Sequence, residues 1–276
     1  MRGGCGAHTI VVLSESQIGR PFAYNCSGCG KKLEFGQILL KAPDSLSFHV
    51  FGDESCADNM VLYGLLLLNE NDVEGAENDF VHIIKSAGVP IGSRFHAKEV
   101  FNGIARSKSV WSHLSDKEIW AIAKKLLISL KSHRAMFNIG IVDRESYPKK
   151  MPSGTGQEIL VSPEHLYSLA FQAAFITFDE HGLINPQTSI RLWIDPQKSR
   201  IALWGGGKIQ VQTLYKYKHI APEKIEETKP ILLDAADLFT YVAGRAVSNQ
   251  PSTNKQICKE LFELCNPNRS DTKWVP

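Results

Sequence analysis

The stretch Phe48–Ser55, with the sequence FHVFGDES, decides the fold. Its first four residues predict a strand that stops at the Gly-Asp-Glu-Ser segment, and the apolar run Met60–Leu68 predicts a second, buried strand. A strand that ends on acidic side chains is informative, because functional groups gather at the carboxyl ends of strands in open α/β sheets.

Outward from this stretch, the chain alternates between strand and helix patterns. Further strands are predicted over Met136–Val142 and Ser189–Ile194, and helices over Val73–Ala87, from Ser115 to about Ser132, from Ser162 to about Asp179 and over Leu233–Val247. Ser115 and Glu118 form a capping box, and Pro163 occupies the first position of its helix. This alternation predicts an α/β domain with a mixed sheet.

The composition is that of a globular protein. The 276 residues are 43% hydrophobic and 22% charged, which excludes collagen-like, coiled-coil and wholly disordered chains. A formal net charge of +2, from 31 basic and 29 acidic residues, excludes a strongly charged nucleic-acid-binding tail but permits a local basic patch. No apolar run approaches the roughly 20 residues of a membrane span, and the N-terminus lacks a secretory apolar stretch. We expect a cytoplasmic protein that does not enter the membrane, and leave its oligomeric state open.

Residues 1–45 differ from the rest of the chain because they are rich in glycine and cysteine. They contain strand-like segments at Thr9–Leu13 and Ile38–Lys41, and residues 42–45 (Ala-Pro-Asp-Ser) form a turn or linker. The sequence therefore predicts a small module over residues 1–45 and a main domain over residues 46–276.

The N-terminal module carries a metal-ligand pattern. Cys5 and His8 form one closely spaced pair, and Cys26 and Cys29 form a second after an intervening loop of zinc-ribbon length. This spacing predicts a tetrahedral structural Zn²⁺ site. Two alternatives stay open: free thiols on a flexible N-terminus, and a thiol-based enzyme that uses Cys26 and Cys29 for redox chemistry.

Acidic side chains in the main domain suggest a second metal site. Asp53 and Asp195 each follow an apolar strand, and Asp234 and Asp237 share one face of the last helix. Clustered carboxylates repel one another, and a divalent cation with a preference for oxygen, Mg²⁺ or Mn²⁺, removes that repulsion. Each aspartate alone is also a common turn or helix-cap residue, so the joint pattern carries the interpretation.

Three short motifs resemble the domain-of-unknown-function family 3800: Asp53-Glu54-Ser55, then Phe95-His96-Ala97-Lys98-Glu99, then Leu233-Asp234-Ala235-Ala236-Asp237-Leu238. That family opens with Asp-Glu-Ser-Gly and closes with Leu-Gln-x-Ala-Asp-Leu. It is grouped with the ribonuclease H-like fold, whose members are mostly metal-dependent nucleases and related phosphoryl-transfer enzymes. The resemblance covers roughly residues 46–250, and implies a ribonuclease H-like mixed sheet flanked by helices.

The resemblance assigns roles position by position. Asp53 matches the first-strand aspartate that is expected to bridge two metal ions, Asp195 resembles the fourth-strand aspartate, and Asp237 matches the closing Ala-Asp. Glu99 is the candidate for the second acid. Cys56 stands where the family has glycine. This difference puts in doubt whether the chain turns tightly after Ser55, but it removes none of the candidate metal ligands.

Other residues of the motifs have a weaker assignment. Glu54 is a further candidate metal ligand, and Asp234 replaces the family's glutamine as either an extra ligand or a helix N-terminal acid. His96 either binds or orients phosphate or is a structural residue. Asp143 and Glu145 are rival acids that we interpret as surface charges.

Two further features lie outside the motifs. Lys208, Lys216 and Lys218 lie among glycine and aromatic residues. This pattern is typical either of a segment that binds a nucleic-acid backbone or of an edge strand whose lysines prevent pairing with another chain. Cys258 and Cys265 are seven residues apart on one helix face and are expected to be core thiols.

The sequence as a whole predicts a metal-dependent nuclease that hydrolyses phosphodiester bonds of DNA or RNA. The catalytic residues would be Asp53, Glu99, Asp195 and Asp237, holding one or two Mg²⁺ or Mn²⁺ ions. The substrate contacts would come from His96, Lys208, Lys216 and Lys218, and the zinc module would dock nucleic acid or a protein partner. The alternative is a non-catalytic nucleic-acid- or protein-binding protein that retains the fold.

Overall fold

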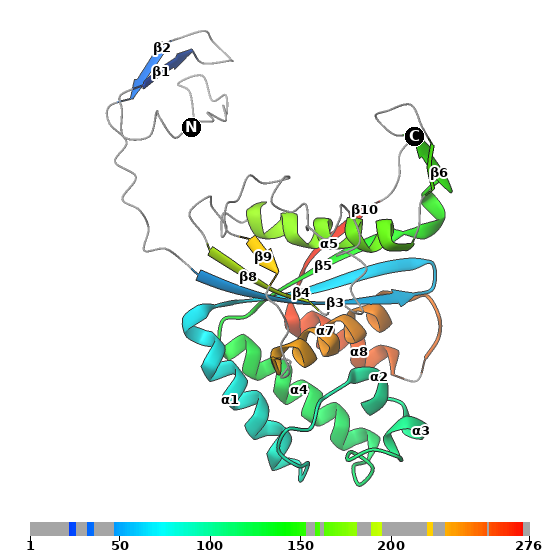
Figure 1. Ribbon diagram of the computed structural model, residues 1–276. Helices are drawn as coiled ribbons and strands as arrows, with labels where there is room; N and C mark the ends of the chain where they lie inside the picture. The colour runs from blue at the N-terminus through cyan, green and yellow to red at the C-terminus, as the bar shows by residue number, and fades with distance from the viewer. Residues whose placement is uncertain are drawn as a thin grey trace. The chain divides into compact units, whose positions relative to one another are not determined.

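In the computed structural model the chain divides into two compact units, Met1–Ser45 and Leu46–Pro276, with the boundary at the end of the predicted linker (Figure 1). The structure describes residues 22–25, 32–35, 47–152, 158–160, 163–180, 189–194, 220–222, 230–252 and 254–272. None of the helices in these ranges is long and apolar enough to cross a membrane.

The described part of the first unit is an antiparallel hairpin. Strand β1 (Phe22–Asn25) pairs with β2 (Lys32–Phe35), and Asn25 lies opposite Lys32. Residues 26–31, which include Cys26 and Cys29, connect the two strands. The strands predicted at Thr9–Leu13 and Ile38–Lys41 lie outside the described residues.

The second unit alternates strands and helices, which confirms the predicted α/β class. Its strands are β3 (Ser47–Ala57), β4 (Met60–Asn69), β5 (Met136–Asp143), β6 (Lys150–Pro152), β7 (Glu158–Leu160), β8 (Ser189–Ile194), β9 (Ile220–Pro222) and β10 (Asn268–Thr272). Its helices are α1 (Glu70–Ser86), α2 (Ala97–Val100), α3 (Gly103–Arg106), α4 (Asp116–Ser132), the 3-10 turn η2 (Arg144–Ser146), α5 (Pro163–Glu180), α7 (Leu232–Val247) and α8 (Lys255–Cys265).

Within the described ranges, six strands form one mixed sheet in the order β10-β5-β4-β3-β8-β9. Strand β4 is antiparallel to both of its neighbours, β3 and β5, whereas β3 pairs with β8, β8 with β9, and β5 with β10 in parallel. Strands β6 and β7 form a separate antiparallel pair. The central strand β3 therefore has an antiparallel partner on one side and a parallel partner on the other.

Strand β3 is longer than the sequence predicts. It does not stop at the Gly-Asp-Glu-Ser segment but continues to Ala57, because residues 53–57 pair with residues 60–64 of β4 across a two-residue turn. Asp58 in that turn adopts a left-handed φ of 54°, a conformation that aspartate tolerates better than most residues. The parallel partner β8 is shorter and its pairing ends at Gly52 opposite Ile194, so Asp53 is the first residue beyond the parallel pair.

The start of α4 follows a predicted capping signal, whereas the start of α1 does not. Ser115 caps α4 through a reciprocal capping box with Glu118, as predicted. The Asn69 side chain caps α1 by accepting a hydrogen bond from the backbone of Asn71, so the helix begins three residues before the predicted start at Val73. Gly88, just beyond the end of α1, has the positive φ of 76° that favours glycine.

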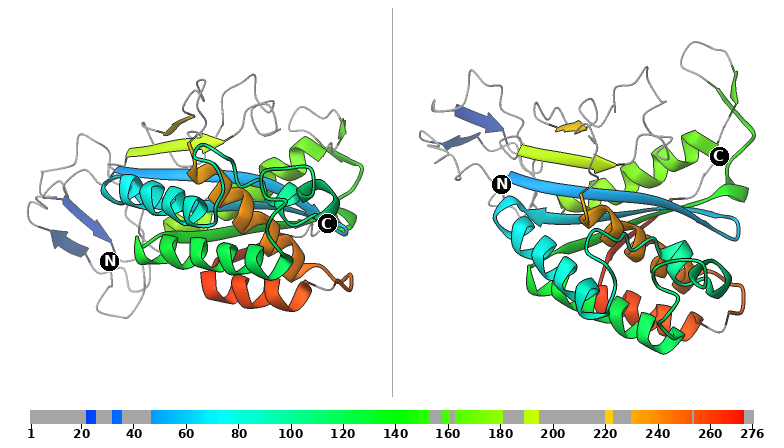
Figure 2. Two further views of the ribbon diagram at one scale, coloured as in Figure 1. Left: turned by 90° about the horizontal axis from the view of Figure 1, so that it is seen from below. Right: turned by 60° about the horizontal axis from the view of Figure 1, so that its bottom comes forward.

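Helices cover both faces of the sheet (Figure 1). Helix α5 lies on one face and packs against β4, β5 and β10, whereas α7 packs against β3 and β4 on the other face, with α1, α4 and α8 around it. Figure 2 shows α1, α4 and α8 side by side on that second face. Because both faces of the sheet are covered, alternate side chains of β4 are buried in two separate hydrophobic cores. This explains why the sequence of β4 is a continuous apolar run.

Two glycines set the distance between the sheet and its helices. A β-carbon on Gly140 of β5 would lie 1.8 Å from the carbonyl oxygen of Ala170 in α5. A β-carbon on Gly64 of β4 would lie 2.1 Å from the Oγ1 atom of Thr240 in α7. Both contacts are far below van der Waals distance, so only glycine permits this close approach of the two helices to the sheet.

Candidate functional site

A cavity of about 810 Å³ opens where β3 and its turn face α7 and the segment before α2. Its lining residues are Asp53, Glu54, Ser55, Cys56, Ala57, Asp58, His96, Lys98, Tyr167, Asp237, Tyr241, Gly244, Arg245, Ser248 and Gln250. We call it the carboxylate cavity. It brings together residues from the three motifs that were singled out in the sequence.

Asp53 and Asp237 meet at the wall of this cavity. The two carboxyl groups lie close enough to interact directly, and the backbone N–H of Glu54 also interacts with the Asp53 carboxyl. Burial, followed by the charges of Asp237 and Glu54, raises the pKa of Asp53 well above its usual range.

The local packing explains why these two residues meet. Asp53 and Phe51 are two residues apart, so their side chains point to the same face of β3. Phe51 belongs to the hydrophobic core on the face that α7 covers. Gly64 lies directly opposite Asp53 on β4, and its missing side chain is what lets α7 approach the sheet at this level. The Thr240 hydroxyl of α7 donates to the backbone carbonyl oxygen of Ala236 at 2.7 Å and lies 3.4 Å from the backbone carbonyl oxygen of Asp53.

Asp237 is held from its other side by the start of α2. The backbone N–H of Ala97 donates to its Oδ2 atom at 2.9 Å, and the His96 Nδ1 atom lies 3.6 Å from the same oxygen. The side chains of Asp237 and His96 are 23% and 43% exposed, so both reach the cavity. His96 therefore lies beside Asp237, at the edge of the cavity.

Asp234 has a different environment from Asp237. Arg94 donates to both of its carboxylate oxygens, with distances of 2.6–3.0 Å, and the Phe95 backbone N–H donates to Oδ2 at 2.8 Å. Burial raises the pKa of Asp234 even though Arg94 opposes the shift. Both oxygens are occupied by this arginine and backbone, so we leave Asp234 out of the proposed metal ligands.

Glu54 lines the cavity, whereas Glu99 does not. Glu99 lies in the one-turn helix α2 and is exposed, so the structure does not bring it to Asp53 and Asp237. Across the described residues, no group of three histidine, cysteine, aspartate or glutamate side chains is arranged to hold a metal ion. Asp53 and Asp237 offer two neighbouring carboxylates, and carboxylate oxygens are the ligands that a hard cation such as Mg²⁺ prefers.

Cationic and aromatic side chains occupy the rest of the cavity wall. Lys98 of α2 and Arg245 of α7 both line it, and the Arg245 guanidinium carbon lies 5.5 Å from the centre of the Tyr241 ring. On another part of the wall, the Cys56 sulfur lies 2.8 Å from the Tyr167 hydroxyl of α5. The cavity therefore combines a carboxylate pair with positive charge, which suits a substrate that is anionic beside its reacting centre.

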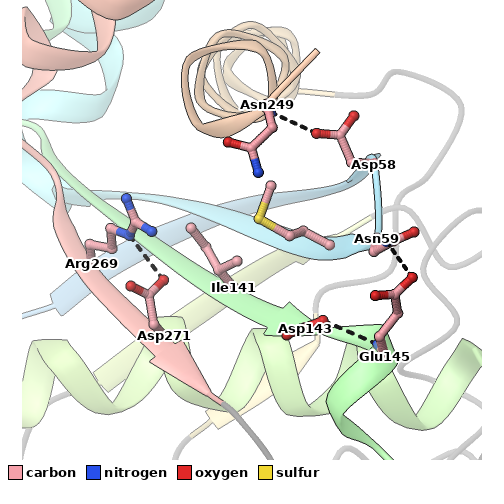
Figure 3. Close-up of a pocket in the computed structure, with 9 residues that line it drawn as sticks. Asp58, Asn59, Ile141, Asp143, Glu145, Asn249, Arg269 and Asp271 are labelled. Atoms are coloured by element: carbon pink, nitrogen blue, oxygen red, sulfur yellow. Dashed lines mark hydrogen bonds and ion pairs between the residues drawn. The ribbon is translucent and has the colours of Figure 1, made fainter.

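A second, smaller cavity of about 370 Å³ contains the rival acids (Figure 3). Asp143 and Glu145 line it together with Asp58, Arg269 and Asp271. Asp143 accepts the Glu145 backbone N–H, Asn59 donates to Glu145, Arg269 donates to Asp271, and Asp58 accepts from Ser248 and Asn249. These acids hold turns and strand ends together, and Asp143 is half-buried whereas Glu145 is exposed.

Several predicted site residues lie outside the described part of the chain: Cys5, His8, Cys26, Cys29, Asp195, Lys208, Lys216 and Lys218. Cys258 and Cys265, in contrast, are described and buried, which confirms the prediction of core thiols. Burial raises the pKa of each of these two thiols to about 12.

Sequence reasoning missed four residues of this region: Gly64, Arg94, Tyr241 and Arg245. A signal existed for the last two, because Asp237, Tyr241 and Arg245 recur at intervals of four on one helix. Arg94 and Gly64 carried no such signal, since their roles depend on partners that are remote in the sequence.

The comparison with known proteins gives no match: no family model, no curated protein and no solved structure is similar to the chain. The functional interpretation therefore depends on the residues themselves.

Proposed function

We propose that this chain is a divalent-cation-dependent phosphodiesterase that cleaves nucleic acid, with a main domain of the ribonuclease H-like class. The observation that carries the proposal is the contact between Asp53 of β3 and Asp237 of α7 in a cavity that also presents Lys98 and Arg245. The mixed sheet with helices on both faces, in which β4 runs antiparallel to β3 and β5, supports the fold class that the motif resemblance implies.

Asp53 and Asp237 would hold the cation through their carboxylate oxygens, and Asp195, the residue after Ile194, completes the proposed catalytic set. A bound Mg²⁺ or Mn²⁺ would neutralise the carboxylates, activate water for attack on phosphorus and stabilise the leaving oxygen. The chain's own contribution is to fix the ligands: the Ala97 N–H orients Asp237, and the Glu54 N–H orients Asp53. His96, next to Asp237, would orient the phosphate.

We also propose that the first unit holds a structural Zn²⁺ through Cys5, His8, Cys26 and Cys29. The β1–β2 hairpin supports this proposal, since Cys26 and Cys29 lie in the connection between two paired strands. Short hairpin connections of this kind keep two cysteines close enough to share one metal ion.

The test of the catalytic proposal is cleavage of single- and double-stranded DNA and RNA by the full chain in Mg²⁺ and Mn²⁺. Asp53→Asn preserves the shape of the side chain but removes a ligand charge, so activity should fall by roughly 10³-fold or more. Asp271→Asn, the same change at an exposed position in the second cavity, is the matched control and should retain activity.

Melting temperatures with and without Mn²⁺ provide a readout that does not depend on catalysis. Mn²⁺ should raise the melting temperature of the unmodified chain and of Asp271→Asn, but not that of Asp53→Asn. The proposal is wrong if the chain cleaves no phosphodiester, or if Asp53→Asn cleaves nucleic acid as well as the unmodified chain does. In either case the non-catalytic binding protein becomes the better interpretation.

A further inference from the structure

One face of helix α7 presents a column of functional side chains to the carboxylate cavity. Asp237, Tyr241 and Arg245 follow one another at intervals of four residues, and all three line the cavity. Residues spaced in this way lie above one another on a helix, and the rise of 1.5 Å per residue separates the Cα atoms of Asp237 and Arg245 by about 12 Å. The column therefore leads away from the carboxylate pair toward a cationic end.

Tyr241, in the middle of the column, is held in place by a stack of aromatic rings. Its ring is stacked on Phe101 with centres 5.0 Å apart and an interplanar angle of 14°, and Phe101 is stacked in turn on Trp120 of α4 at 4.1 Å. Burial raises the pKa of the Tyr241 phenol, so the ring carries no negative charge at neutral pH. Tyr241 is thus a fixed, neutral platform between two charged groups.

Arg245 lies at the outer end of this platform. Its guanidinium carbon is 5.5 Å from the Tyr241 ring centre, a distance at which a cation is attracted to an aromatic face. Arg245 is an exposed residue of α7, and Ser248 and Gln250 add polar side chains to the same end of the cavity. A planar guanidinium held in this way is well suited to a phosphate, because it offers several donors in a fixed geometry.

The separation of the two ends restricts the substrate. The Cα atoms of Asp237 and Arg245 are about 12 Å apart along the helix, and a small phosphodiester held at Asp53 and Asp237 has no second phosphate to offer Arg245. A polynucleotide carries further phosphates on both sides of the one that reacts. A polynucleotide can therefore occupy the carboxylate pair and Arg245 with two different phosphates.

We propose that Arg245, positioned by Tyr241, binds a phosphate that flanks the reacting one, and so makes the site selective for polynucleotides over small phosphodiesters. This inference rests on the proposed function, since it takes the carboxylate pair as the reacting centre. It assigns Arg245 as a substrate-binding residue and Tyr241 as a positioning residue.

The first experiment measures binding without catalysis. An oligonucleotide is titrated with the full chain in Ca²⁺ at several salt concentrations, for the unmodified chain, Arg245→Gln and Arg144→Gln. Loss of one charged phosphate contact should weaken binding by Arg245→Gln about tenfold. The same loss should reduce the slope of log Kd against log salt by about 0.7–0.9. Arg144→Gln, an exposed arginine outside the cavity, should change neither quantity.

The second experiment compares two substrates in Mn²⁺: the oligonucleotide and bis(p-nitrophenyl) phosphate. Arg245→Gln should lower kcat/KM for the oligonucleotide and leave that for the small diester unchanged. Tyr241→Leu should resemble Arg245→Gln, whereas Tyr241→Phe, which preserves the ring, should retain oligonucleotide binding.

The outcomes separate this inference from the proposed function. If the unmodified chain does not bind the oligonucleotide, or if Arg245→Gln leaves the salt slope unchanged, the flanking-phosphate site is wrong even where the chain hydrolyses the small diester. Equal losses of activity on both substrates would also overturn it, because Arg245 would then act at the reacting centre. Binding with the expected slope but no hydrolysis of either substrate would support the phosphate site and contradict the proposed catalysis.

Discussion

Arg94 and Asp234, 140 residues apart in the sequence, form a forked ion pair that fastens the segment before α2 to helix α7. The Phe95 N–H donates to the same carboxylate, and the Arg94 guanidinium also donates to the carbonyl oxygen of Pro230. Because Asp237 receives the Ala97 N–H from the same segment, this pair indirectly positions the candidate catalytic carboxylate.

Because Asp234 forms this ion pair, we expect its substitution to lower the stability of the folded chain. Asp234→Ala should lower the free energy of unfolding by about 3 kcal/mol, because it leaves a partly buried guanidinium and a buried N–H without their acceptor. Urea denaturation measures this change, and combining Asp234→Ala with Arg94→Ala should cost less than the sum of the two single changes. If Asp234 instead bound a cation, its loss would leave metal-free stability unchanged or increased and would abolish the Mn²⁺ effect on melting temperature.

The raised pKa of Asp53 predicts the pH dependence of stability in the metal-free protein. The folded chain keeps the proton on Asp53 at pH values where the unfolded chain releases it. The resulting stabilisation is therefore complete below the ordinary aspartate pKa of about 4 and is lost as the pH rises through the higher pKa of the folded state.

Asp53→Asn provides the comparison for this pH effect, because its side chain does not titrate. In the presence of a chelator, Asp53→Asn should become progressively more stable than the unmodified chain as the pH rises. The measurement is the difference in unfolding free energy between the two proteins from pH 4 to pH 9. A difference that does not change with pH would show that Asp53 titrates normally.

Gly64 should be sensitive to the smallest substitution. Gly64→Ala would place a β-carbon 2.1 Å from the Thr240 Oγ1 atom, which forces α7 away from the sheet beside Asp53. Overpacking of this kind costs about 1–3 kcal/mol, and the shift of α7 should reduce cleavage as well. Adding Thr240→Ala removes the closest atom and should restore part of the stability, as measured by thermal denaturation; no recovery would place the strain elsewhere.

For Glu99, the role predicted from the sequence and the position in the structure disagree. It was predicted to be the second catalytic acid, yet it is exposed and does not line the carboxylate cavity. We expect Glu99→Gln to retain cleavage within about twofold, because substitutions at exposed positions usually change local energies by less than 0.5 kcal/mol. A loss of activity comparable to that of Asp53→Asn would show that the α2 segment moves to bring Glu99 to the cation.

The proposed zinc site predicts a pattern of thiol reactivity. Among the described cysteines Cys56 is exposed, whereas Cys258 and Cys265 are buried with a pKa of about 12. Protein purified without a chelator should contain about one zinc per chain and release it with Cys26→Ser. Before chelation, a thiol reagent at pH 8 should label Cys56 first. Chelation should expose Cys5, Cys26 and Cys29, and absence of zinc with immediate labelling of all three would contradict the site.

Patterns that depend on neighbouring residues were accessible from the sequence. The capping box at Ser115 and the apolar run of β4 depend on adjacent positions, so the sequence itself determined the α/β class and most element boundaries. The extension of β3 to Ala57 was missed, because polar residues 53–55 remain in a strand only when β4 pairs with them.

Tertiary contacts decided which carboxylate of α7 lies beside Asp53. Asp234 and Asp237 share one helix face, and their spacing does not show the partner of either. In the folded chain Asp234 pairs with Arg94, because the segment before α2 packs against the start of α7. Asp237 lies beside Asp53, because Gly64 lets α7 approach the sheet at this level. Sequence spacing determines which residues can share a face, whereas the partner of each charge depends on which remote segment packs there.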